Sequence, residues 1–163
     1  MTTTTTSISA DFAAIVARME FEAVALSRLA SQNAWSEVPL ASTADLVVSL
    51  LTTVDALSAV AADGVAVVHT SGALPAGQIS TKRWLEVATG KSARSAGAKV
   101  ARSMSLRDTF ARTRMAWLSG AISDDMVRVI TMGIPLALQR LNVAEQPELI
   151  DKIEAEIVHY AME

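Results

Sequence analysis

Four basic side chains recur at helical spacing in the middle of the chain: Lys91, Arg94, Lys99 and Arg102. At about 100° per residue they fall within an arc of roughly 140° on one side of a helix. The opposite side carries small or apolar residues, namely Ala93, Ala96, Gly97, Val100 and Met104. Lysine and arginine side chains gathered on one exposed face neutralise phosphate oxygens. The spacing therefore predicts a phosphate-binding helix.

These residues belong to a basic segment that lies between two acidic ones. Residues 82–114 hold nine basic and two acidic side chains, which gives a net charge of +7. Residues 1–81 and residues 115–163 each carry −5, so the 163 residues together carry only −3. A concentrated positive segment favours a polyanionic partner such as DNA. The alternative is that it docks on an acidic segment, either of its own chain or of a second copy.

Other reactive groups are sparse in this sequence. The chain has no cysteine, which excludes a disulfide framework, a thiolate zinc site and a thiol nucleophile. His69 and His159 are its two histidines, and they are far apart in sequence without the spacing of metal ligands. Asp124 and Asp125 follow Ser123, where carboxylates stabilise the positive end of a helix dipole. We therefore expect no catalytic residue, no bound metal and no cofactor.

The composition predicts an all-α fold. Alanine, the strongest helix former, occurs 29 times, and aromatic residues make up 4% of the chain. Apolar and polar residues seldom alternate with the period of two that marks a strand. We expect a bundle of about seven helices, forming a single helical domain over residues 10–163 after a disordered Thr-rich tail at residues 1–9. The Gly- and Pro-containing loop at residues 71–78 is a candidate sub-boundary.

Capping residues and apolar periodicity locate the expected helices. Gly120 is expected to end the fifth helix, and Pro135 to kink or end the sixth. The seven helices are expected from about Asp11 to Ala30, from Ser42 or Thr43 past Val60, from Ser80 to Ala88, from Ser92 to Met104, from Leu106 to Leu118, from Ser123 onward and from Pro147 onward.

The chain is rich in apolar residues, with 51% hydrophobic residues and a mean hydropathy of +0.34. Asp55 and Asp63, together with Gly and Pro residues, interrupt its apolar stretches, so we expect none to reach the ~20 residues of a membrane span. Residues 1–9 lack the basic region of a secretory signal. These observations predict a cytoplasmic protein that does not insert into a membrane.

The segment near residues 80–104 has the layout of a helix-turn-helix unit, with a turn at Thr89-Gly90-Lys91 between its two helices. The second helix of such a unit enters the major groove, and Ser92 at its N-cap leaves first-turn amides for a phosphate. Glu86 stands where such units usually have alanine, so a helical hairpin with a solvated charged face is the alternative. The candidate nucleic-acid contacts are Lys82, Arg83, Lys91, Ser92, Arg94, Lys99 and Arg102.

From about Val54 onward, several short motifs occur in a characteristic order. They are Ser80-Thr81-Lys82-Arg83-Trp84-Leu85, Thr89-Gly90-Lys91-Ser92 with Ala96, Ala101-Arg102, and Ala116-Trp117-Leu118-Ser119-Gly120-Ala121-Ile122-Ser123. Together they resemble the domain of unknown function found N-terminal to HNH endonucleases in actinobacteria and their phages. The resemblance covers roughly residues 54–163 and implies a helical module that targets such a nuclease to DNA.

Two positions depart from the pattern of that family. Met126-Val127 stands where the family commonly has His-Ala, and Asp108-Thr109 stands where it commonly has proline. The HNH module, with its two histidines and asparagine around a metal, does not occur in these residues. We therefore expect a nucleic-acid-binding or targeting module of an HNH-nuclease-like protein that is not catalytic by itself. The alternative is a protein-interaction or oligomerisation module that uses the complementary basic and acidic segments, for example in a homo-oligomer.

Overall fold

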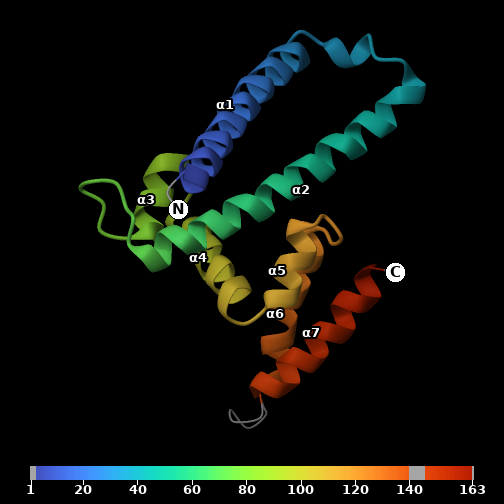
Figure 1. Ribbon diagram of the computed structural model, residues 1–163. Coiled ribbons are helices and arrows are strands. Elements are labelled where there is room, and N and C mark those ends of the chain that lie inside the picture. Colours follow the sequence, from blue (N-terminus) through green and yellow to red (C-terminus); the bar gives the residue numbers. More distant parts are fainter. Residues whose placement is uncertain (1–2, 140–145, 163) are drawn as a thin grey trace. The chain divides into compact units, whose positions relative to one another are not determined.

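The computed structural model describes residues 3–139 and 146–162, with side chains from residue 8 onward (Figure 1). Within these ranges the chain forms seven α-helices, one 3-10 helix and no strand, which confirms the predicted all-α fold. The elements are α1 (Thr3–Ser31), η1 (Ala34–Ser36), α2 (Leu40–Ser71), α3 (Thr81–Thr89), α4 (Ala93–Asp108), α5 (Ala111–Leu118), α6 (Asp124–Leu138) and α7 (Gln146–Met162).

The chain divides into two compact units, a first unit of residues 1–48 and a second unit of residues 49–163. The division falls within α2, whereas the loop at residues 71–78 lies inside the second unit. Residues 10–163, for which a single domain stays a prediction, span both units, and the two units differ in their interiors. Burial explains the difference, because no side chain described in the first unit is buried, while the second unit encloses an apolar core.

The first helix is longer than its sequence suggests. It begins at Thr3, inside the segment for which the composition predicts a disordered tail, rather than near Asp11. Met1 and Thr2, which belong to the same prediction, lie outside the described residues. Threonine is less favourable in a helix than alanine by no more than ~0.7 kcal/mol per residue. A helix that is already formed can therefore extend through a few threonines at small cost.

Among the described helices, α2 is the one that is long and apolar enough to cross a membrane by length and composition alone, and an 18-residue window within it has a mean hydropathy of 1.6. The prediction that Asp55 and Asp63 interrupt every apolar stretch is therefore wrong for this helix. Both carboxylates bind other helices of the second unit, because Asp55 accepts a hydrogen bond from the backbone N–H of Asp124 and Asp63 pairs with Arg114. The buried residues of α2 all follow Asp55: Ala59, Ala62, Val65 and Ala66.

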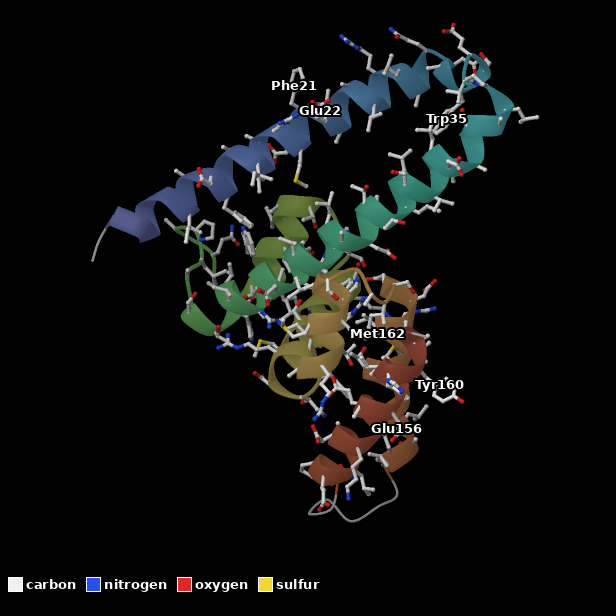
Figure 2. All side chains as sticks on the ribbon, turned by 45° about the vertical axis from the view of Figure 1, so that its right-hand side comes forward. Phe21, Glu22, Trp35, Glu156, Tyr160 and Met162 are labelled. Carbon is white, nitrogen blue, oxygen red and sulfur yellow. The ribbon has the colours of Figure 1, made fainter. Side chains whose placement is uncertain are left out.

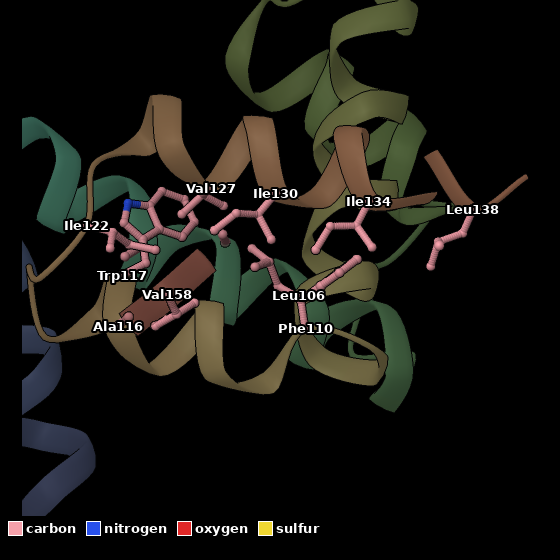
Figure 3. Close-up of a cluster of buried hydrophobic side chains, with 12 residues drawn as sticks. Leu106, Phe110, Ala116, Trp117, Ile122, Val127, Ile130, Ile134, Leu138 and Val158 are labelled. Atoms are coloured by element: carbon pink, nitrogen blue, oxygen red, sulfur yellow. The ribbon is translucent and has the colours of Figure 1, made fainter. Parts of the chain in front are cut away.

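The main core of the second unit is formed by side chains from α2, α4, α5, α6 and α7 (Figure 3). Phe110, Ile130 and Val127 are its largest fully enclosed apolar side chains, each with no exposed surface. The remaining members are Ala59, Ala62, Leu106, Ala116, Trp117, Ile122, Ile134, Leu138 and Val158. Burial of this many apolar groups holds α4 and α6 in fixed positions, which matters because both helices contribute to the site described below.

A buried polar contact joins α5 to α7. The Glu154 carboxylate, 2% exposed, accepts hydrogen bonds from the Thr113 backbone N–H at 2.7 Å and from the Thr113 hydroxyl at 2.8 Å. The carboxylate thus satisfies a first-turn amide of α5 that has no partner within its own helix. Charge-assisted hydrogen bonds of this kind compensate the cost of burying both groups.

The boundary between α4 and α5 differs from the prediction. The break expected between Met104 and Leu106 lies instead after Asp108, where the N–H groups of Thr109 and Phe110 both donate to the carbonyl of Ser105. Leu106 is 2% exposed and therefore belongs to the apolar side of α4. The chain turns where the Phe110 ring enters the core. The position of this turn therefore depends on helices that are distant in sequence, and not on a nearby glycine or proline.

Sequence signals at the end of α5 and along α6 can be compared with the structure. Gly120 adopts a positive φ of 75°, the left-handed conformation that follows the end of a helix. Ser123 caps α6 by accepting a hydrogen bond from the Met126 N–H at 3.3 Å, and Asp124 lies in the first turn. Pro135 lies inside α6, which continues to Leu138, so this proline does not end the helix.

Candidate nucleic-acid interface

The predicted contacts lie on two helices joined by a three-residue turn. Ser80 caps α3 by accepting a hydrogen bond from the Arg83 N–H at 3.2 Å. Ser92 caps α4 in the same way, accepting from the Ser95 N–H at 3.2 Å. Gly90 has a φ of 65° and reverses the chain between the helices. Since the Ser92 hydroxyl is occupied as a cap, Ser92 offers a ligand the free N–H groups of the first turn rather than its side chain.

Close packing fixes α4 against α3 and α2. Leu85 from α3, Ala96 from α4 and Val65 from α2 form a small buried cluster. The short Ala96 side chain, 2% exposed, lets the two helices approach each other. Glu86, the residue that departs from the usual helix-turn-helix pattern, avoids this cluster and pairs with Arg83 at 2.9 Å. Ala96 is therefore buried, whereas Lys91 and Arg94 remain exposed.

Part of the basic segment is neutralised within the chain. Five of the nine basic side chains in residues 82–114 form ion pairs: Arg83, Arg102, Arg107, Arg112 and Arg114. Three of these pairs reach the acidic segments on either side. They join Arg114 to Asp63 at 2.6 Å, Arg102 to Asp124 at 2.5 Å, and Arg112 to Asp151. The complementary charges seen in the sequence thus meet partly inside one molecule.

Four basic side chains of this segment have no ion-pair partner among the described residues. Among the described residues, no carboxylate lies within ion-pair distance of Lys82, Lys91, Arg94 or Lys99. Lys99 is half-buried and the other three are exposed. Lys82 belongs to α3, but a Cβ placed on Gly97 of α4 would lie 3.6 Å from its Cδ and Cε atoms. Its aliphatic stem therefore runs alongside α4, so cations from α3 and α4 lie on one surface.

Three of the predicted residues, Lys91, Lys99 and Arg102, line a groove of about 680 Å³ between α2, α4 and α6. Arg128 of α6 adds a fourth cation to its wall. Asp124 contributes a carboxylate, and small residues of α2 and α4 complete the lining, among them Ser58, Ala62, Ser95, Ala98 and Ser105. We call this the α4 groove. Its volume and its mainly positive side chains suit an anionic group larger than a single ion.

Arg102 is the most constrained cation of the α4 groove. Its guanidinium carbon lies 4.7 Å from the centroid of the Trp117 ring. Its Nη1 and Nη2 atoms donate to the two carboxylate oxygens of Asp124 at 3.3 and 2.5 Å. These contacts hold the guanidinium in one orientation but also use part of its charge. Arg102 therefore differs from the freely exposed phosphate contact that the helical wheel predicts.

The electrostatics of Lys99 reflect its crowded position. Burial lowers the pKa of its ammonium below the usual value of 10.5, and the positive charges of Lys91 and Arg102 lower the pKa further. Asp124 acts in the opposite direction. A bound anion would reduce the repulsion among the positive charges at this site.

This cluster has a measurable consequence for stability. A folded-state pKa below 10.5 means that the unfolded chain binds more protons in the window between the two pKa values. The free energy of unfolding is therefore expected to rise as the pH increases through that window. Replacing Lys99→Met, which keeps the aliphatic stem, is expected to raise the melting temperature at neutral pH, and the gain should shrink toward pH 10.5. Thermal melts of Lys152→Met, altered on exposed α7, provide the control; an equal gain there would contradict the explanation.

The other four predicted residues, Lys82, Arg83, Ser92 and Arg94, do not line the α4 groove. Arg83 forms its ion pair with Glu86 along α3. Sequence reasoning missed Arg128 and Trp117. Arg128 lies outside the basic segment and is exposed on α6, so no local pattern marks it. Trp117 is a core residue with 3% exposure, and its ring also supports Arg102.

The described residues contain no group of three His, Asp or Glu side chains that could hold a metal ion. His69 has a structural contact instead, with its Nδ1 atom 3.1 Å from the hydroxyl of Thr81. This contact joins the end of α2 to the beginning of α3.

No family model, curated protein or solved structure matches this chain. The resemblance to the domain that precedes HNH endonucleases therefore rests on the short motifs quoted above.

Proposed function

We propose that the second unit binds nucleic acid through its phosphate backbone, with the α4 groove and the exposed cations beside it as the contact surface. The observation that carries the proposal is the set of unpaired cations around the first half of α4: Lys82, Lys91, Arg94 and Lys99. A fixed helix that presents unneutralised cations attracts a polyanion over a distance of about 8–10 Å in salt solution.

Each element of the surface has a distinct role in this proposal. Lys91 and Lys99 on one side, and Arg94 on the other, contact successive phosphates along the backbone. The free N–H groups in the first turn of α4 accept one phosphate at the positive end of the helix dipole. Arg102, oriented by Asp124 and Trp117, contributes positive charge to the wall of the groove. No catalytic step is assigned to any of these residues.

The type of cation favours binding that depends little on base sequence. Two of the three groove residues that were predicted, Lys91 and Lys99, are lysines, which act as point charges rather than as bidentate readers of base edges. Arg94 is the exposed guanidinium that could reach a base. We therefore propose a module that holds nucleic acid while a partner or a further domain supplies specificity.

A salt titration tests this proposal. The chain is titrated into a short fluorescently labelled DNA duplex, and the dissociation constant is measured by anisotropy at several salt concentrations. Four phosphate contacts predict a slope of log affinity against log salt of about −3 to −4, hence a loss of about 100-fold between 50 and 200 mM. An anisotropy that stays flat at about 50 mM salt would overturn the proposal.

The wider setting of the module is proposed on the resemblance. We propose a cytoplasmic, DNA-directed part of an HNH-nuclease-like protein, non-catalytic by itself. The alternative, assembly through complementary charged segments, is less favoured because Asp63, Asp124 and Asp151 already pair with arginines of the same chain.

A further inference from the structure

The first unit carries an apolar pattern that the nucleic-acid interface does not use. Apolar side chains of α1 recur at alternating intervals of four and three residues, the spacing of a coiled-coil seam. The pattern covers six apolar positions, with Glu22 at the seventh. These positions are Ile8, Phe12, Ile15, Met19, Leu26 and Leu29. We call this set the α1 stripe.

The side chains of the α1 stripe are largely exposed. Five of its apolar side chains are between 48% and 66% exposed, and Met19 is half-buried. Figure 2 shows the neighbouring Phe21 and Glu22 projecting from α1 into solvent. A helix in water gains most of its stability by burying an apolar face. A helix of 29 residues with an uncovered seam therefore requires a partner.

The exposed area is of the size that a helix pair buries. An aromatic residue presents roughly 150–250 Å² and a large aliphatic residue somewhat less. At exposures near one half, the α1 stripe and its margins expose on the order of 500 Å². Monomeric proteins rarely expose larger contiguous apolar patches, and a standard interface buries about 800 Å² on each partner. The α1 stripe would supply the larger part of such an interface, and the side chains that flank the stripe would supply the rest.

We propose that a second copy of this chain covers the α1 stripe, in an antiparallel pair of α1 helices. From Phe12 to Leu29 the α1 stripe is symmetric about a point between Glu20 and Phe21, so reversing the helix superimposes these six positions on one another, and Ile8 lies outside this repeat. In that register Phe12 meets Leu29 of the second copy, and Ile15 meets its Leu26. A different protein would need a matching pattern, whereas a second copy supplies one by symmetry.

Glu22 selects the orientation of the pair. A parallel pair would place the two Glu22 carboxylates opposite each other within the seam, where like charges and their desolvation both oppose association. The antiparallel register places Glu22 opposite Met19 of the second copy. Each carboxylate then lies beside a flexible thioether side chain near the middle of the pair. The two carboxylates occupy successive layers of the seam rather than lying directly opposite each other. Glu22 weakens the pair but excludes the parallel form.

Sedimentation of the full chain over a concentration series tests this proposal. The wild type is expected to form dimers, and Ile15→Glu to raise the dimer dissociation constant at least tenfold. Glu22→Leu is expected to tighten association, since it replaces the single charged residue of the seam. Val24→Glu is the matched control, because Val24 is 70% exposed on the opposite side of α1 and should leave the dimer unchanged. Circular dichroism establishes that each variant remains helical.

Several outcomes would overturn the proposal. A wild-type chain that stays monomeric at every concentration would do so, as would equal effects of Ile15→Glu and Val24→Glu. Flotation with phosphatidylcholine vesicles provides a further test. A monomer that floats with the vesicles through α1 would identify a lipid surface as the occupant and contradict a second copy. The sedimentation experiment does not involve DNA, so the proposed dimer and the proposed DNA-binding surface are tested independently.

Discussion

Replacing Phe110→Ala is expected to lower the free energy of unfolding of the second unit by about 3–5 kcal/mol. The Phe110 ring has no exposed surface and packs among side chains from α4, α5 and α6 (Figure 3). Removing the ring loses its transfer free energy and leaves a cavity that these helices cannot close, because they are fixed by their other contacts. Urea unfolding followed by far-ultraviolet circular dichroism measures the change.

Phe110→Leu is the matched control for that experiment. Leucine preserves an apolar side chain that reaches the same place, so the loss should fall to about 1–1.5 kcal/mol. A loss below about 1 kcal/mol for Phe110→Ala would contradict the described core. It would mean that α4 and α6 are not held together at this point, and the α4 groove between them would lose its support.

Replacing Arg94→Gln and Lys99→Gln together is expected to weaken DNA binding by about 10- to 100-fold at low salt. The two side chains have no ion pair within the described residues, so their positive charge is available to phosphate. Glutamine keeps most of the length and polarity of each side chain while removing its charge. Because phosphate contacts carry no sequence information, the loss should be equal on two duplexes of unrelated sequence.

A second double variant controls for net charge. Arg28→Gln with Lys152→Gln removes the same two charges from the exposed surface of α1 and from α7. Its affinity is expected to change by less than about twofold, since salt screens exposed charges that do not contact a phosphate. Equal losses in the two double variants would mean that total charge, rather than the face of α4, determines binding.

Local sequence signals were sufficient for most of the helix ends. Ser80, Ser92 and Ser123 each cap a helix through a hydrogen bond to an N–H three residues later, so the donor and the acceptor are neighbours in sequence. The end of α4 could not be predicted in the same way. It depends on the burial of Phe110 against helices that lie far away in the chain.

The candidate site was predictable as far as it lies on one helix face. Lys99 and Arg102 share a groove because helical spacing places them together, whereas Lys91 reaches the groove from the turn before the N-cap Ser92. The neutralisation of Arg102 by Asp124, 22 residues away, and of Arg114 by Asp63, 51 residues away, follows from tertiary packing. No pattern of neighbouring residues encodes such pairs, so the sequence overestimates the free positive charge of the segment.

The most direct test of the account compares salt dependences. Affinity for one duplex is measured at several salt concentrations for the wild type and for the Arg94→Gln, Lys99→Gln double variant. If both side chains contact phosphate, the slope of log affinity against log salt becomes shallower by about 2 units in the variant. Equal slopes for the two proteins would show that neither side chain contacts a phosphate, and would contradict the assignment of the α4 groove and the exposed cations beside it as the nucleic-acid interface.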